Sequence, residues 1–226
     1  AFGRLDGHLG RDATLSHAAS IVQATDLPVS ADLENCFADE PAGVAETVRD
    51  ATAIGLAGCS IEDFTGHPDD PIYEPSAAAA RVEAAAEAAH AGMTRLVLTA
   101  RADNHIHDRG DLADTIARLQ SYQTAGADVL YAPGLTDIED IRRLVAEVDR
   151  PVNVLTRPGL PPVADLAAAG VRRISVGGAF AFAALAVVVE AARELREQGT
   201  YRFLEPSSAG LAAIRQAIVA GQNTPS

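Results

Sequence analysis

Short apolar segments alternate along the chain with longer stretches whose apolar residues recur at helical spacing. The strand-like segments are residues 28–32, 57–62, 95–100, 127–132, 151–156 and 172–177. They are continuous apolar runs, which is typical of strands that are covered on both faces of a parallel sheet. The helical stretches are residues 12–24, 41–55, 75–92, 111–126, 137–148 and 162–170, and several end in glycine, as helix C-termini often do. The pattern predicts an α/β protein built from parallel βα units.

Two architectures fit this pattern, an open doubly wound sheet and a (β/α)8 TIM-type barrel. No GxGxxG motif follows a first strand, which disfavours the dinucleotide-binding form of the open sheet. Barrel enzymes place catalytic residues at the carboxyl ends of several strands, and three strands here end in such residues, which favours the barrel. They are Asp32 and Glu34, Glu62 and Asp63, and Arg101 and Asp103. A barrel needs eight strands and the pattern supplies six, so we expect the first two strands to be missing from this chain. We predict one barrel domain over residues 1–226, with a mobile active-site loop at residues 64–75 and a C-terminal helical segment at 179–226.

Acidic residues end the first two predicted strands. Asp32 and Glu34 are two residues apart and would share a face in an extended strand, where like charges raise each other's pKa unless a cation lies between them. On the next strand, alternation with Cys59 and Ile61 turns Glu62 towards the same mouth. Three converging carboxylates suit a hard cation such as Mg²⁺ or Mn²⁺. The plainer alternative is that Asp32 caps a turn and Glu34 begins a solvated loop.

Further candidates follow the later strands. Arg101 would pair with a carboxylate or phosphate of a substrate, or else form a salt bridge with one of the acids. Asn153 would point into the barrel end, where its amide would hydrogen-bond either to substrate or to neighbouring groups of the protein. Gly177 and Gly178 allow close approach of the backbone to an oxyanion, or simply turn the chain.

Histidines occur in two loops of the sequence. His67 lies in the loop at residues 64–75, a candidate lid over the site. It is a candidate catalytic side chain, although a lone loop histidine is more often inert. His105 and His107 form an HxH pair, but no third nitrogen or thiolate ligand has suitable spacing, so a solvated loop is favoured over a metal pair.

The composition limits the chemistry. All 18 basic residues are arginine, so Schiff-base and pyridoxal-phosphate mechanisms, which need a lysine amine, are excluded. A net charge of −13 argues against nucleic acid and against an anionic membrane surface as partners. The two cysteines have no CxxC spacing, and the sequence shows neither a leader nor a membrane-spanning pattern. We therefore expect a cytoplasmic protein with reduced thiols.

Six segments in order, PVSADLEN, GCSIEDFTG, LTARADN, ADVLYAPG, PVNVLT and RRISVGGA, resemble the isocitrate lyase/phosphoenolpyruvate mutase superfamily. The resemblance implies a (β/α)8 barrel whose last helix is swapped between the subunits of a homodimer or homotetramer. It also implies Mg²⁺ held largely through water by carboxylates matching Asp32, Glu34 and Glu62, a substrate contact by Arg101, and a further acid near Asp6. A Ser-Gly turn that grips the substrate in the family has no counterpart here.

Departures from the family narrow the expected reaction. The loop at residues 64–75 has neither the Lys-x-Cys-Gly motif of the lyases nor the Lys and Asn-Ser pair of the mutases. The shared chemistry, a 2-oxo acid and its stabilised enolate, favours a Mg²⁺-dependent lyase acting on a small 2-oxo or 2-hydroxy (di)carboxylate, for example by decarboxylation of oxaloacetate, with the proton taken from water or a loop group such as His67. The alternatives are a phosphonate mutase or hydrolase and a catalytically silent protein that binds 2-oxo acids.

Overall fold

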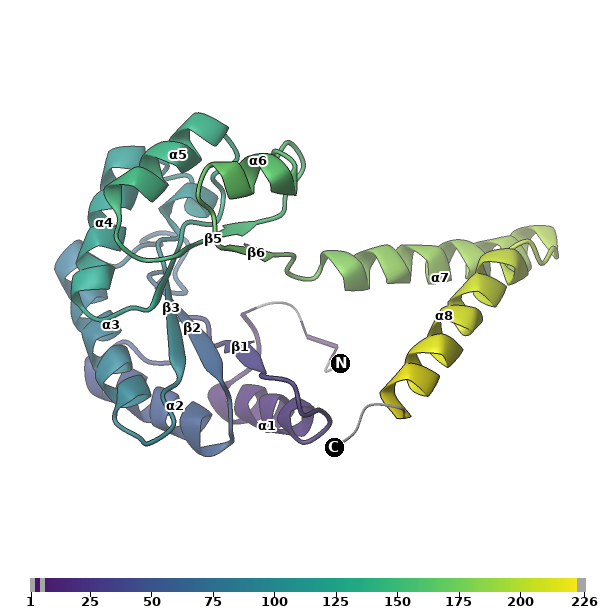
Figure 1. Cartoon of the computed structure of the whole chain (residues 1–226), viewed down its shortest axis with the longest axis horizontal. Coiled ribbons are helices and arrows are strands. Elements are labelled where there is room, and N and C mark those ends of the chain that lie inside the picture. Colours follow the sequence, from purple (N-terminus) through teal and green to yellow (C-terminus); the bar gives the residue numbers. More distant parts are fainter. Residues whose placement is uncertain (1–2, 5–6, 223–226) are drawn as a thin grey trace. The chain divides into compact units, whose positions relative to one another are not determined.

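The strands form one parallel sheet that curls into half of a barrel (Figure 1). The computed structural model describes residues 3–4 and 7–222, without the side chains of 220–222. Its strands are β1 (Ser30–Asp32), β2 (Gly58–Glu62), β3 (Val97–Arg101), β4 (Val129–Tyr131), β5 (Val152–Leu155) and β6 (Arg173–Ser175). They lie in sequence order, each parallel to the next. The predicted strands and the barrel-type curl are thus confirmed.

Helix α1 precedes the first strand, and further helices connect each strand to the next. Helices α2 to α5 lie along the outer side of the sheet (Figure 1). The bounds of these helices are α1 (Arg11–Val22), α2 (Pro41–Ala53), α3 (Pro75–His90), α4 (Leu112–Thr124), α5 (Ile138–Glu147) and α6 (Val163–Ala168). Asp111 and Asp137 cap α4 and α5 by accepting hydrogen bonds from backbone N–H groups of the first turn. Gly126 follows α4 with φ +107°, and a Cβ there would lie 2.9 Å from the Cβ of Ala86. Its predicted role at a helix end is therefore required both by backbone conformation and by close packing.

The two faces of the sheet differ in character because side chains alternate along each strand. The outer set packs on the helices and is apolar, with Cys59, Ile61, Leu98, Ala100, Leu130 and Val154 all buried. The register places the other set in rows across the inner face, where Glu62, Arg101, Tyr131, Asn153 and Arg173 are successive partners. The hydrophobic core thus lies between sheet and helices, and the polar residues share the concave side.

The chain divides into two compact units, one up to Ser175 and the other from Val176 onward. The second unit holds α7 (Ala179–Gln198) and α8 (Leu204–Gln222), joined by a turn at Gly199 with φ +63°. α7 has no buried residue, and many of its large apolar side chains are exposed, including those of Phe180 and Phe182. Among the described helices, none is both long enough and apolar enough to cross a bilayer.

Candidate active site

A cavity of about 410 Å³ opens where β1, β2 and β3 end. The carboxyl ends of the strands are where barrel enzymes place their catalytic groups. Strand ends and the short helix η1 (Asn104–His107) contribute its titratable and charged lining. The charged or titratable side chains in this lining are Asp32, Glu34, Glu62, Arg101, Asp103 and His107.

Arg101 is the centre of the charged group. Its Nη1 lies 2.7 Å from Oδ2 of Asp32, and its Nη2 lies 3.0 Å from Oε2 of Glu62. Asp103 binds the same guanidinium in a bidentate manner, from Nε at 3.1 Å and from Nη2 at 2.7 Å. The salt bridge considered as an alternative for Arg101 therefore exists, and it involves three carboxylates.

The three carboxylates differ in exposure. The side chain of Asp103 is 1% exposed and that of Glu62 is 10% exposed, whereas that of Asp32 is 59% exposed. Asp103 thus holds Arg101 from the protein side, and Asp32 meets it at the mouth of the cavity. The pairing with Asp32 is the one most easily exchanged for a ligand, because water already reaches that carboxylate.

The β1 end differs from the sequence expectation. The strand stops at Asp32, and Glu34 lies in a turn with φ +52°. Oδ1 of Asp32 accepts hydrogen bonds from the Glu34 N–H at 3.1 Å and from Oγ of Ser60 at 3.0 Å. The Glu34 carbonyl accepts from the Glu62 N–H at 3.0 Å. The two acids line one cavity because a turn stabilised by Asp32 itself redirects the chain, and not because they alternate along one strand.

Burial and excess negative charge control the protonation of the group. Burial raises the pKa of Glu62 to about 8, against the opposing effect of Arg101. Burial also raises the pKa of Asp103, again opposed by Arg101. For Arg101, burial alone would lower the pKa, but Asp103, Asp32 and Glu62 raise it. One guanidinium does not neutralise this many carboxylates, so the cavity attracts further positive charge.

The donor set suits a divalent cation such as Mg²⁺ or Mn²⁺. Asp32, Glu34 and Glu62 offer hard carboxylate oxygens to one cavity that has room for water, and Mg²⁺ usually keeps several water ligands. Within the described part of the chain, no three His, Cys, Asp or Glu side chains lie close enough to enclose an ion directly. The residues therefore fit a hydrated cation better than a dry cage. Asp6, the further acid that the resemblance implies, lies outside the described residues.

The other predicted site residues are placed differently. Asn153 is 3% exposed on the inner face, where its Nδ2 donates to Oγ of Ser175 at 3.0 Å and its Oδ1 has no hydrogen-bond partner. His67 is exposed in the loop after β2 and is not part of the described cavity lining. Gly177 and Gly178 belong to the second unit, where Gly177 has φ +51° and Gly178 precedes α7. Their roles stay predictions.

Sequence reasoning missed His107, which it assigned to a solvated loop. Its ring lines the cavity and stacks on Phe64, with centroids 4.0 Å apart and an angle of 8° between the planes. Asp103 precedes η1 as its N-cap residue, so the helix that carries His107 begins three residues after Arg101. The sequence LTARADNHIH contained part of this information. Because the HxH segment directly follows the polar end of a strand, Arg101 and His107 reach the same cavity.

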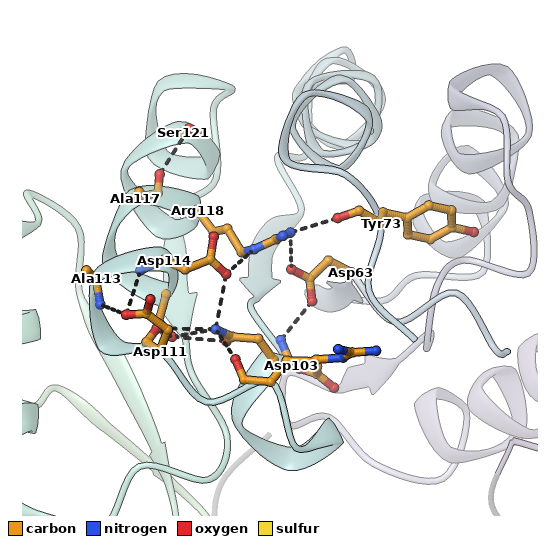
Figure 2. A network of polar contacts seen from close by, with 12 residues as sticks. Asp63, Tyr73, Asp103, Asp111, Ala113, Asp114, Ala117, Arg118 and Ser121 are labelled. Carbon is orange, nitrogen blue, oxygen red and sulfur yellow. Dashed lines mark hydrogen bonds and ion pairs between the residues drawn. The ribbon is translucent and has the colours of Figure 1, made fainter. Parts of the chain in front are cut away.

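Asp63 was expected only as a polar strand end, and the structure shows that it anchors Asp103 and the neighbouring helix through a buried network (Figure 2). Its Oδ1 accepts the Asp103 N–H at 2.7 Å, and its Oδ2 accepts from the Tyr122 hydroxyl at 2.6 Å and from Arg118 Nη1 at 3.3 Å. Arg118 Nη1 also donates to the Tyr73 carbonyl at 2.8 Å. Burial raises the pKa of Asp63 to about 6. The loops after β2 and β3 are thereby joined to α4 by one buried network.

Comparison with known proteins gives this geometry a family context. The phosphoenolpyruvate phosphomutase family matches residues 1–196. An uncharacterized protein of Mycobacterium tuberculosis is 32% identical over 197 residues, covering 86% of this chain and 72% of the relative. An oxaloacetate decarboxylase of Chromohalobacter salexigens is 30% identical over 192 residues, covering 81% of this chain and 64% of that enzyme.

Two solved structures from Burkholderia cenocepacia J2315 are similar to this chain. One, described as a candidate lyase or mutase, is 52% identical with a TM-score of 0.85, covering 88% of this chain and 72% of that one. The other, described as a candidate phosphonomutase, is 35% identical with a TM-score of 0.76, covering 84% of this chain and 80% of that one.

Proposed function

Because the chain belongs to the phosphoenolpyruvate mutase/isocitrate lyase superfamily, we propose that it is a Mg²⁺-dependent lyase acting on a small 2-oxo or 2-hydroxy (di)carboxylate. The observation that carries the proposal is Arg101, held among Asp32, Glu62 and Asp103 in a cavity at the strand ends. The reaction proposed first is decarboxylation of oxaloacetate, in line with the name of the Chromohalobacter relative.

In this proposal Arg101 binds the substrate and the carboxylates hold the cation. Arg101 binds the carboxylate of the substrate through Nη1, whose partner in the structure is the exposed Asp32, while Asp103 keeps hold of Nε and Nη2. Arg101 is always charged and its fork matches a carboxylate, so it orients the substrate without exchanging a proton. Asp32, Glu34 and Glu62 would hold the cation, mostly through water. A bound divalent cation supplies the positive charge that stabilises an enolate oxygen.

Asn153 fits the other side of the substrate in this proposal. Its side chain is buried in the same register row as Arg101, two strands further along the inner face. Its unpartnered Oδ1 is an acceptor that a 2-hydroxy or enol O–H group would satisfy. We assign His67, Gly177 and Gly178 no step in this reaction.

A phosphonate mutase or hydrolase is the second candidate, favoured by the likeness to the Burkholderia phosphonomutase candidate. A guanidinium binds a phosphonate as well as a carboxylate, so Arg101 alone does not separate the two. Release of pyruvate or phosphate from phosphonopyruvate would favour this alternative. A silent protein that binds 2-oxo acids would show ligand-dependent stabilisation without any turnover.

We also propose that the chain assembles as a homodimer or homotetramer through the helices of the second unit. Large apolar side chains of α7 and α8 are exposed, including Leu185, Val188 and Leu211. Exposed apolar side chains in such number favour a surface that another chain covers. A molar mass measured by light scattering, for the chain and for a Val188→Glu variant, tests the assembly independently of activity.

Oxaloacetate consumption tests the proposed reaction. We expect turnover with Mg²⁺ above the background of Mg²⁺ in buffer, loss of turnover with EDTA, and loss in an Asp32→Ala variant. Asp26→Asn is the matched control, because it removes an exposed carboxylate before β1 that lies outside the described cavity lining. An unchanged rate of oxaloacetate consumption in the presence of EDTA, or in the Asp32→Ala variant, would overturn this proposal.

A further inference from the structure

His107 is the one described cavity-lining side chain, apart from the carboxylates and Arg101, that has an acid–base group. Arg101 cannot give up a proton near neutral pH, and Asp103 has both carboxylate oxygens engaged by Arg101. The remaining carboxylates of the lining, Asp32, Glu34 and Glu62, are those assigned above to the cation. The chain has no lysine. Histidine is the side chain that exchanges a proton most readily at neutral pH.

The position of His107 is fixed from two sides. Its ring stacks on Phe64, which pairs with Ile72 in an antiparallel bridge at the base of the loop after β2. Its helix η1 is anchored by Asn104, whose Nδ2 lies 2.8 Å from Oγ1 of Thr115 on α4. A ring held between two anchored loops has a defined orientation, which general acid–base catalysis requires.

We propose that His107 is the catalytic acid that protonates the enolate carbon, an inference that rests on the proposed function and adds a step to it. In the decarboxylation of oxaloacetate, the C3–C4 bond breaks, CO₂ leaves, and the electron pair forms the enolate C2=C3 bond. The protonated imidazole then gives its proton to C3, which yields pyruvate and a neutral ring. Water restores the proton to the imidazole, so one proton is consumed for each CO₂ released.

A purely structural ring would make the same stacking contact with Phe64, so loss of stability alone does not test the proposal. The distinguishing reaction is the reverse proton transfer. A neutral His107 would remove a methyl proton from pyruvate and return a deuteron from D₂O, and this exchange breaks no carbon–carbon bond. The methyl signal of pyruvate in the proton NMR spectrum therefore reports the histidine step separately from decarboxylation.

The experiment measures pyruvate exchange in D₂O and oxaloacetate consumption, both with the Mg²⁺-loaded full chain. We expect His107→Gln to reduce exchange by about 10²- to 10⁴-fold, the usual contribution of a general acid or base. His107→Phe keeps a ring for stacking and should lose exchange to the same extent. His17→Gln, an exposed histidine of α1, is the matched control and should exchange like the wild type.

The outcomes separate the two proposals. Exchange that persists in His107→Phe, or that is lost in His67→Gln instead, overturns the assignment of His107. If wild-type protein exchanges pyruvate but does not consume oxaloacetate, and His107→Phe does not exchange, the decarboxylase proposal fails while the acid–base role stands. A wild-type protein that does neither overturns both.

Discussion

Asp103 is buried and follows β3 at the carboxyl ends of the parallel strands, which we call the carboxyl edge. Asp128 is half-buried and precedes β4 at their amino ends, the amino edge. The pKa of Asp103 is raised, whereas that of Asp128 is lowered. At the carboxyl edge, Glu62 and Asp103 share Arg101 with Asp32, and burial raises the pKa of both buried acids. At the amino edge, Asp128 precedes β4. Burial alone would raise its pKa, but the Leu98 N–H, His90 and Arg95 hold it below the usual value.

The difference lies in the ratio of donors to acids. The single carboxylate of Asp128 has three partners: the Leu98 N–H at 2.9 Å, Nε2 of His90 at 2.9 Å and the guanidinium of Arg95. Arg101 alone serves three carboxylates. A carboxylate with several hydrogen-bond and ion-pair partners stabilises the fold. Several carboxylates that share one cation repel one another, and an added cation reduces this repulsion. Charge at the amino edge therefore serves stability, and charge at the carboxyl edge is available for binding.

Replacing the shared guanidinium should have the largest effect. We expect Arg101→Met to lower kcat/KM for oxaloacetate by about 10³-fold or more, because the substrate carboxylate loses its partner. The same change leaves buried Glu62 and Asp103 uncompensated, so the free energy of unfolding without Mg²⁺ should fall by about 3–5 kcal/mol. Steady-state kinetics and urea unfolding measure the two effects. Arg101→Lys should not restore the activity, because an ammonium lacks the fork that Asp103 and the substrate share.

If Arg101→Met retained wild-type kinetics, the carboxyl edge would be a structural ion-pair network like the amino edge, and the contrast between the edges would fail. The unfolding measurement guards against misreading a misfolded variant, since the loss of kcat/KM counts only for protein that shows a cooperative unfolding transition.

Removing the exposed acid should greatly reduce the stabilisation of the fold by Mg²⁺. Mg²⁺ at 100 times its Kd should stabilise the wild-type protein by about 2.7 kcal/mol. Asp32→Asn should lose most of this stabilisation, because it removes the most exposed carboxylate of the cavity while an amide oxygen can still accept the Glu34 N–H. Thermal unfolding with and without Mg²⁺ measures the difference. An unchanged Mg²⁺ response in Asp32→Asn would place the cation elsewhere.

At the amino edge the expected effect is on stability alone. Asp128→Asn keeps an acceptor for the Leu98 N–H but removes the charge that His90 and Arg95 share, so the free energy of unfolding at pH 7 should fall by about 1–3 kcal/mol. Because the pKa of Asp128 is lowered in the folded state, its contribution is complete above the unfolded value of about 3.9 and disappears as the pH falls through the folded value. Urea unfolding of both proteins at pH 7 and in strong acid tests this sign.

Activity supplies the control for that prediction. Asp128 lies outside the described lining of the cavity, so folded Asp128→Asn protein should keep the wild-type kcat. A loss of kcat without a loss of stability would show that the amino edge is not merely structural.

The sequence predicted the parts of this comparison that depend on periodicity. Continuous apolar runs located the strands, and the acids and Arg101 that follow them were placed at one mouth because parallel strands end together. It did not predict that His107 lines the cavity, nor the buried contacts of Asp63, which it had placed only as a polar strand end. His107 reaches the cavity through a short helix after β3, and Asp63 is buried by Tyr122 and Arg118, which are distant in sequence. Such contacts depend on how loops fold back onto the sheet, which no local period encodes.

The smallest predicted effect is on the free energy of unfolding, when Arg95 at the amino edge is removed. The side chain of Arg95 is 60% exposed, so its pair with Asp128 is screened by water, and Asp128 keeps the Leu98 N–H and His90 when Arg95 is removed. We expect Arg95→Ala to reduce the free energy of unfolding by about 0.2–1 kcal/mol, less than Asp128→Asn, with no change in kcat. The effect should shrink further in 1 M salt, since exposed pairs are screened at that ionic strength. An effect as large as that of Asp128→Asn would mean that the amino edge depends on one arginine as strictly as the carboxyl edge does.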